Sequence, residues 1–372
     1  MTEIHGFCPE RLTPVRDVFA ANFAADQEIG ARFSVCEDGE LVLDLYAGWA
    51  DRAKTRPFTS DTLVPVFSLT KALGAFMLAW AVERGLLDYE QTVASVWPEF
   101  AQAGKGAVTV GQALSHQAGL SGFAEPVDPE LWFDWDAVCA HAAAMAPMWP
   151  PGTASGYAPA LWGFVAGEIF RRADGRRLGR ALAEDFARPF GLDLWIGLPA
   201  SEDARVAELR KPAGLSDFGE HNEPTLAAFL RPWSSPRATG EAWRRVENPS
   251  VNGLVTAEAA ARLMSVMATG GALDGRPVLS PATIAAASRE RIRGQDLVLP
   301  FELSWAAGFT RNAPGMVYGP NPDAFGHAGW GGSCAFADPA RRLSAAYTPN
   351  RQSTTLIGDP RSVRLIEALY SI

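Results

Sequence analysis

Strand-like segments lie at both ends of this 372-residue chain, and helical patterns fill its middle. Near the start, residues 31–36 and 41–46 are joined through Asp38-Gly39. This is a strong hairpin signal, because both turn residues must tolerate positive φ. Near the end, residues 333–338 and 343–348 flank a turn. We therefore predict one antiparallel sheet built from the two termini.

Helical patterns occur mainly in the middle of the chain, among loops rich in proline and glycine. The clearest predicted helices cover residues 10–25, 69–84, 110–115, 160–172 and the segment after Asp359-Pro360,. We predict an α/β fold in which residues 1–75 and 241–372 form a sheet domain flanked by helices. Residues 76–240 form an inserted, mostly helical domain, and the active site lies in the cleft between the two.

The composition is that of an ordinary globular protein and excludes several classes of function. Hydrophobic residues make up 48% and charged residues 20% of the chain. The net charge of −9 argues against a nucleic-acid partner, because such proteins normally carry a basic face,. The four cysteines form no CxxC pair, and HxH and HExxH are absent. We therefore expect neither a metal site nor a cofactor.

The sequence also bears on location. The first eight residues lack the basic segment and the apolar run of a signal peptide,. The longest apolar run, residues 72–82, is too short to cross a bilayer,. These features predict a cytoplasmic protein with no membrane span. The oligomeric state is left open, and a monomer is the simplest expectation.

The most informative segment for chemistry is 67–71, at the start of predicted helix 69–84. Ser68 and Lys71 are three residues apart and share a helix face, so the hydroxyl and the amine can meet,. Burial on so apolar a helix lowers a lysine's pKa toward the neutral amine that accepts a proton. The helix N-terminus also favours an oxyanion. The simpler alternative is an N-cap at Ser68 and a surface role for Lys71, but a lysine there is expensive unless it is used.

The segment Phe67-Ser68-Leu69-Thr70-Lys71 resembles the nucleophile motif of class C β-lactamases, penicillin-binding DD-peptidases and family VIII carboxylesterases. Further landmarks of those families follow in the same order: Leu114-Ser115-His116-Gln117-Ala118-Gly119-Leu120, Tyr157-Ala158-Pro159, Asn252-Gly253-Leu254 and His327-Ala328-Gly329. The resemblance covers about residues 30–350. It implies a β-lactamase/transpeptidase-like fold and a serine hydrolase.

The resemblance implies roles for further residues. Tyr157 is the second proton-transfer group, with Lys71 stabilising its phenolate or sharing its proton, since an unperturbed tyrosine has a pKa of about 10. His327 falls where a lysine is usual, and is expected to hydrogen-bond Tyr157 or a substrate oxygen. Gly329 lets the strand approach the substrate. The N–H groups of Ser68 and Trp330 form the oxyanion hole, and the Trp330 side chain walls the pocket.

Plainer alternatives stay open for several residues. Tyr157 can instead be an aromatic side chain that packs at the start of a helix. His327 can be a structural histidine in a strand whose ring nitrogens are hydrogen-bonded. His116 is interpreted as structural. The aromatic group of the helical insert is either core or one wall of the pocket; it consists of Trp132, Phe133, Trp135 and Trp149.

Three functions fit these residues. The favoured one is a serine carboxylesterase that hydrolyses short-chain, small-molecule esters through an acyl-enzyme on Ser68. Pro159 and His327 replace an asparagine and a lysine that serve amide- and carboxylate-bearing substrates in the lactamase pattern. The alternative is a β-lactamase, amidase or DD-peptidase-type hydrolase on the same scaffold. The third, a non-catalytic binding protein, is disfavoured because Ser68, Lys71 and Tyr157 are all retained.

Overall fold

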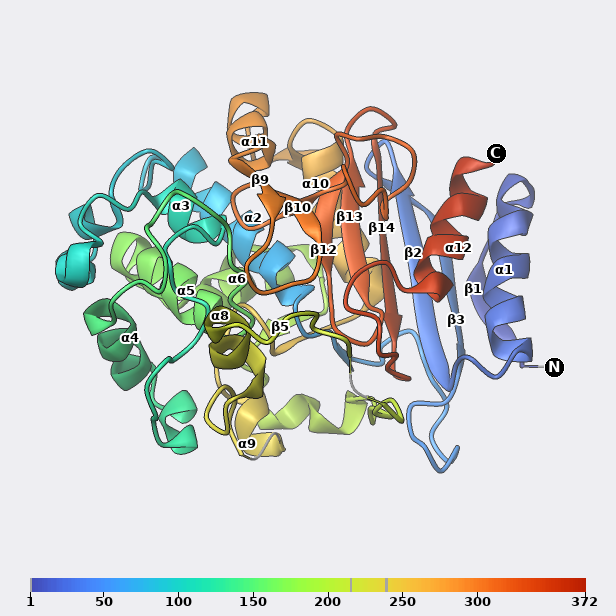
Figure 1. Cartoon of the computed structure of the whole chain (residues 1–372). Helices are drawn as coiled ribbons and strands as arrows, with labels where there is room; N and C mark the ends of the chain where they lie inside the picture. Colours follow the sequence, from blue (N-terminus) through green and yellow to red (C-terminus); the bar gives the residue numbers. More distant parts are fainter. Residues whose placement is uncertain (1, 215, 238–239) are drawn as a thin grey trace.

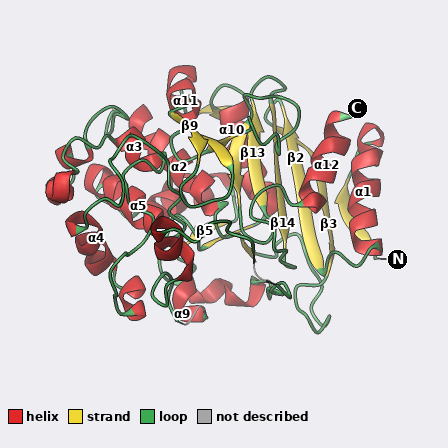
Figure 2. Ribbon diagram, in the orientation of Figure 1, coloured by secondary structure: helices red, strands yellow, loops and turns green. Residues whose placement is uncertain are grey.

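A large antiparallel sheet lies beside a mostly helical half in the computed structural model, which describes residues 2–214, 216–237 and 240–372 (Figure 1 and Figure 2). Within these residues the sheet has nine strands, in the order β1-β3-β2-β14-β13-β12-β11-β10-β9. Their bounds are β1 Ile4–Phe7, β2 Gly30–Glu37, β3 Glu40–Gly48, β9 Ile292–Gln295, β10 Glu302–Trp305, β11 Thr310–Arg311, β12 Phe325–Ala328, β13 Cys334–Asp338 and β14 Leu343–Pro349.

The sheet joins the two ends of the chain. β2 pairs antiparallel with β3 on one side and with β14 on the other. In the turn between β2 and β3, Asp38 has φ 51° and Gly39 has φ 90°, the positive values that an Asp-Gly hairpin turn requires,. The predicted α/β fold, with an antiparallel sheet drawn from both termini, is confirmed.

Helices cover both faces of the sheet. Their bounds are α1 Thr13–Ala24, α2 Thr70–Glu83, α3 Val110–Leu114, α4 Trp135–Ala144, α5 Leu161–Asp174, α6 Leu178–Leu182, α7 Arg188–Phe190, α8 Glu223–Thr225, α9 Glu241–Arg244, α10 Ala257–Ala268, α11 Pro281–Ser288 and α12 Pro360–Tyr370. None of the described helices is long and apolar enough to cross a membrane.

Two separate cores form because side chains alternate along the strands. α1 and α12 lie side by side on one face, and Phe336 and Tyr347 belong to the core beneath them (Figure 1). α10 packs on β2, β13 and β14 from the opposite face, where Ala335, Ala337 and Ala346 are buried. The small side chains on this second face let α10 approach the sheet closely.

Helix α2 is the buried centre of the molecule. It packs against α5, α6, α11 and strand β12. Eleven of its residues are buried, and only Trp80, Val82 and Glu83 are partly exposed. The apolar composition of this segment predicts such burial. The helix therefore carries Lys71 away from bulk water.

A small second sheet holds the segment that leads into α2. Strand β6 (Gly253–Val255) pairs with β4 (Val64–Pro65) and with β5 (Leu194–Ile196). Another short pair, β7 (Ala272–Leu273) with β8 (Arg276–Pro277), lies after α10. The division into domains at residues 75 and 240 stays a prediction.

Candidate active site

Ser68 lies in a tight turn directly before α2. Phe67 has φ 49°, a left-handed conformation that is uncommon for a residue other than glycine,. Thr70 holds this turn, because its hydroxyl donates to the Phe67 carbonyl and accepts the Gly253 N–H at 2.8 Å. The sequence placed Ser68 at the start of the helix, whereas α2 begins two residues later. The Lys71 N–H donates to the Ser68 carbonyl at 3.0 Å and so continues the turn into the helix.

The structure brings Ser68, Lys71 and Tyr157 together. Tyr157 Oη is 2.5 Å from Ser68 Oγ and 3.0 Å from Lys71 Nζ. The direct distance between Lys71 Nζ and Ser68 Oγ is 3.5 Å. All three residues are buried, and Lys71 is fully so. The Tyr157 hydroxyl therefore links Ser68 to Lys71 through two hydrogen bonds that are each shorter than the direct contact.

Two backbone carbonyls determine how the Lys71 amine is oriented. Nζ lies 2.7 Å from the Pro159 carbonyl oxygen and 3.3 Å from that of Ser250. A carbonyl oxygen can only accept hydrogen bonds, and a neutral amine has two N–H groups to give. When both are given to these carbonyls, the lone pair of nitrogen is left facing the Tyr157 and Ser68 hydroxyls. In its neutral form, Lys71 is a proton acceptor directed at the hydroxyl pair.

Burial shifts the two titratable groups of the site in opposite directions. It lowers the pKa of the Lys71 amine well below its usual value, because water no longer solvates the cation,. It raises the pKa of the Tyr157 phenol; the hydrogen bond to Ser68 opposes this shift and the charge of Asp296 adds to it. Both shifts favour the neutral forms. The arrangement thus favours Lys71 as acceptor and Tyr157 as bridge over a tyrosinate base.

Three neighbours hold Tyr157 in place. Its backbone N–H donates to Asp296 Oδ1 at 3.0 Å. The Trp305 ring stacks on its ring, with centroids 5.8 Å apart and an interplanar angle of 9°. The His116 ring lies 5.0 Å away, and its Nδ1 accepts the N–H of Ala158 at 3.1 Å. His116 therefore contacts residues 155–158, here called the tyrosine loop, and does not line the cavity described below.

His327 lies in β12 with one ring nitrogen engaged. Its Nδ1 is 2.7 Å from the Ala328 carbonyl oxygen, so Nδ1 carries the hydrogen and Nε2 the lone pair,. Burial, with the nearby Lys71, lowers the pKa of His327 to about 3. Its ring lies 6.2 Å from that of Tyr157, and Nε2 has no hydrogen-bond partner among the described residues. A neutral acceptor of this kind cannot anchor a substrate carboxylate.

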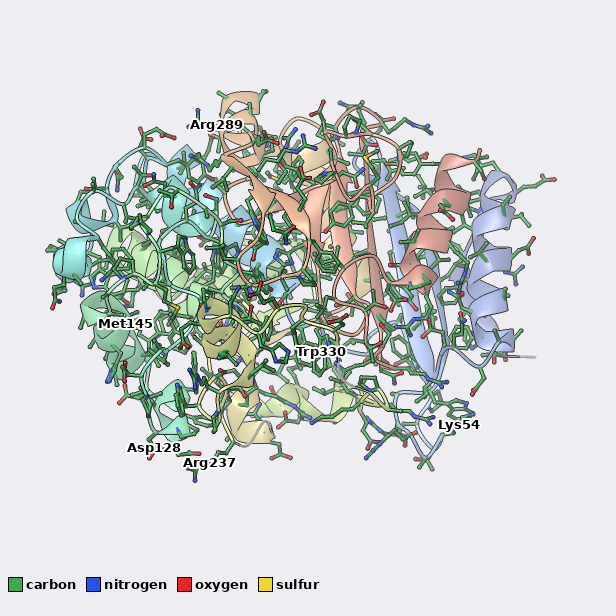
Figure 3. All side chains as sticks on the ribbon, viewed as in Figure 1. Lys54, Asp128, Met145, Arg237, Arg289 and Trp330 are labelled. Carbon is green, nitrogen blue, oxygen red and sulfur yellow. The ribbon has the colours of Figure 1, made fainter. Side chains whose placement is uncertain are left out.

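The segment after His327 passes directly beside the turn that carries Ser68. A Cβ at Gly329 would lie 2.1 Å from the Val66 carbonyl oxygen, so only glycine permits this approach,. The Trp330 ring packs edge-on against Phe67, with centroids 5.5 Å apart, where the sheet meets the helical half (Figure 3). Its indole N–H donates to Ser216 Oγ at 2.8 Å. The role of the Ser68 and Trp330 N–H groups as an oxyanion hole stays a prediction.

A cavity of about 410 Å³ lies over Ser68 and Tyr157. Its apolar lining includes Phe67, Phe218, Phe229, Trp243, Leu299, Trp305, Trp330, Leu356 and Ile357. No lining residue in the described part of the chain is an aspartate, glutamate, lysine or arginine. Of the two interpretations of the aromatic group in the helical insert, the structure favours core for Trp132, Trp135 and Trp149, which are buried and do not line this cavity. Phe133 is half-buried and packs edge-on against Trp243, which does line it.

Sequence reasoning missed the residues that hold the site from distant parts of the chain. Asp296 contacts Tyr157 across 139 positions, and the Ser250 carbonyl contacts Lys71 across 179. No spacing rule links residues so far apart. Ser250 lies just before the Asn252-Gly253 landmark, which is the only local signal for it; for Asp296 the sequence offers none.

The chain is similar to known proteins over nearly its whole length. The model of the Beta-lactamase family matches residues 15–368. The esterase/beta-lactamase LipL of Mycobacterium tuberculosis is 31% identical over 370 residues, which cover 95% of this chain and 84% of that protein. A penicillin-binding protein homolog from Caulobacter crescentus is 60% identical, with a TM-score of 0.98 and 100% of both chains covered. The crystal structure of a family VIII carboxylesterase is 44% identical, with a TM-score of 0.93 and 99% of both chains covered. By this match the chain belongs to the Beta-lactamase family, as a serine hydrolase.

Proposed function

We propose that this protein is a serine carboxylesterase that hydrolyses uncharged, short-chain carboxylic esters through an acyl-enzyme on Ser68. The observation that carries this proposal is the apolar cavity over Ser68, whose described lining has no charged side chain. An uncharged ester buries its apolar surface there, whereas a carboxylate loses its water and gains no cation. The neutral His327 supports the same conclusion. Two of the similar proteins are named as esterases, LipL and the family VIII carboxylesterase, which also supports the proposal.

In the proposed acylation, Ser68 Oγ attacks the ester carbonyl carbon and its proton passes through Tyr157 to the neutral Lys71 amine. The N–H groups of Ser68 and Trp330 stabilise the negative oxygen of the tetrahedral intermediate. The carbon–oxygen bond to the alcohol then breaks. Tyr157 gives a proton to the leaving oxygen and is reprotonated by Lys71, so the amine is neutral again.

Deacylation repeats these steps with water. A water molecule attacks the acyl carbon while its proton moves through Tyr157 to Lys71. The bond between Ser68 Oγ and the acyl carbon breaks, and the returning proton restores the serine hydroxyl. The products are a carboxylic acid and the enzyme in its starting state, and no metal or cofactor is needed.

The test is hydrolysis of p-nitrophenyl butyrate by the purified chain, compared with a chromogenic cephalosporin that carries a carboxylate. We expect kcat/KM for the ester to exceed that for the cephalosporin by at least about 100-fold. Comparable values would overturn the esterase assignment and favour a β-lactamase or peptidase. Ser68→Ala should retain less than about 1% of the ester activity.

A non-catalytic binding protein is the remaining alternative. A fluorophosphonate probe forms a phosphonyl ester with an activated serine and releases fluoride. We expect one adduct by intact mass in the wild-type protein and none in Ser68→Ala. No adduct on the wild type would support the binding protein.

We further propose a cytoplasmic location. The four cysteines are free, and Cys36, Cys139 and Cys334 are buried. Free cysteines fit a reducing compartment, where disulfides seldom persist. Fractionation of cells expressing the natural gene tests this proposal, and recovery of the protein outside the cytoplasm would contradict it.

A further inference from the structure

Asp296 lies in the loop between β9 and β10 and is 4% exposed. Its Oδ1 accepts three backbone N–H groups, from Tyr157 at 3.0 Å, Val298 at 2.9 Å and Leu299 at 3.1 Å. Its Oδ2 accepts the Ser155 hydroxyl at 2.8 Å and the Trp305 indole N–H at 3.3 Å. The carboxylate therefore has five donors, from three separate segments of the chain.

All five donors are uncharged groups. Burying a carboxylate is expensive unless hydrogen bonds replace the lost water, and here neutral dipoles do so in place of a cation. The bonds from Val298 and Leu299 lie within the loop between β9 and β10, which the Asp296 N–H also closes by donating to the Phe301 carbonyl at 3.0 Å. The bonds from Ser155, Tyr157 and Trp305 instead connect this loop to Tyr157 and its immediate surroundings.

These three bonds fix Tyr157 from two directions. Ser155 and the Tyr157 N–H tie the tyrosine loop to the carboxylate on either side of Gly156. A backbone bond from the Leu297 N–H to the Ser155 carbonyl, 2.9 Å long, adds a further tie. The Trp305 indole is held by the same carboxylate while its ring stacks on the Tyr157 ring. One carboxylate thus sets both the backbone of Tyr157 and the surface on which its ring lies.

The position of the Tyr157 hydroxyl matters because it bridges Ser68 and Lys71 at 2.5 Å and 3.0 Å. Misplacement of a reacting group by about 1 Å costs about 100-fold in rate. We propose that Asp296 is a positioning residue for proton transfer, holding the Tyr157 hydroxyl in contact with both Ser68 and Lys71. The inference rests on the proposed acyl transfer at Ser68.

The test measures two rates in Asp296→Ala and Asp296→Asn: ester hydrolysis and fluorophosphonate labelling of Ser68. Alanine removes all five acceptor contacts, so kcat and the labelling rate should fall about 100-fold while KM changes less than about threefold. Asparagine keeps one carbonyl oxygen, so we expect a smaller loss of about tenfold. Ser155→Ala removes a single donor and should lose about threefold, which keeps the test open if Asp296→Ala does not fold.

Asp338 provides the matched control. It is buried as well, at the end of β13, and accepts hydrogen bonds from the Ala340 and Arg341 N–H groups, the Asn321 amide and the Tyr370 hydroxyl. Asp338→Ala should lower the Tm by a similar amount and leave kcat and the labelling rate within about twofold of wild type.

Two results would overturn the positioning role. One is a folded Asp296→Asn protein with wild-type kcat and labelling rate; the other is an equal loss of kcat in Asp338→Ala. The labelling rate separates this inference from the proposed function. A wild-type protein that labels rapidly but does not hydrolyse esters refutes the esterase and still permits the Asp296 comparison.

Discussion

Among the residues that the structure describes, Lys71 and Lys105 are completely buried, and they are held in different ways. Lys105 lies beside the C-terminal end of α4, where its amine donates to the carbonyls of Gln102 at 2.9 Å, Ala143 at 3.0 Å and Met145. Lys71 is the second residue of α2 and has only two carbonyls, with two hydroxyls completing its surroundings.

The two lysines differ in their hydrogen-bond partners and in which end of a helix they lie near, and this difference separates a structural lysine from one suited to proton transfer. Three carbonyls take all three N–H groups of an ammonium, and the negative end of a helix dipole stabilises the cation at Lys105. At Lys71 the amine has two carbonyls and the Tyr157 hydroxyl around it, and the positive end of α2 disfavours its cation,. Burial lowers the pKa of both amines,. Their surroundings differ, because the three carbonyls and the helix C-terminal end favour the cation of Lys105, whereas the helix N-terminal end favours the neutral amine of Lys71.

Replacing Lys71 should have the largest effect. Lys71→Met removes the proton acceptor, and we expect kcat for a p-nitrophenyl ester to fall at least about 1000-fold. Lys71→Arg should lose as much, because a guanidinium keeps its proton and offers no lone pair. A Lys71→Arg enzyme with a tenth of wild-type activity would show that the cation, and not the neutral amine, is what the site needs.

Tyr157→Phe removes the hydroxyl that links Ser68 to Lys71, a kind of partner that Lys105 lacks. Direct transfer from Ser68 to Lys71 across 3.5 Å remains, so we expect a loss of about 100-fold in kcat, smaller than that of Lys71→Met,. The comparison uses the same ester and a check of folding by circular dichroism. A loss in Tyr157→Phe larger than in Lys71→Met would make the tyrosine the main base.

The pH dependence of kcat/KM sharpens the assignment of Lys71. Because burial lowers the pKa of Lys71, the rate should rise with pH along a limb whose midpoint lies well below the usual lysine value, as the amine loses its proton,. It should fall only at high pH, since the pKa of Tyr157 is raised. His327, with a pKa of about 3, contributes no limb near neutral pH. A midpoint at the usual lysine value would contradict a neutral Lys71.

Lys105→Met should have the smallest effect on activity. The substitution removes the amine donor from the buried Ala143 carbonyl and from the partly buried carbonyls of Gln102 and Met145, so we expect the free energy of unfolding to fall by about 2 kcal/mol,. The ester kcat should stay within about twofold of wild type. Urea unfolding, read alongside the ester assay, checks both. If Lys105→Met lowered kcat without lowering the stability, Lys105 would not be a purely structural lysine and the proposed difference from Lys71 would be wrong.

Local patterns in the sequence predicted much of the fold. The Asp38-Gly39 turn and the Asp359-Pro360 start of α12 are each fixed by adjacent residues, and the burial of α2 follows from its apolar composition. They also pointed to the residue types of the site, because Ser68 and Lys71 lie three positions apart across the turn that leads into α2. The family resemblance, not a local rule, added Tyr157.

Tertiary structure decided how those residues work. In the sequence Lys71 and Lys105 are both lysines among apolar neighbours, and only packing gives one of them three carbonyls and the other two. The same holds for Asp296, which reaches Tyr157 across 139 positions, and for the cavity lining. Side-chain identity fixes which chemistry is available, but the proton state and direction of a buried group depend on distant partners that no local spacing specifies.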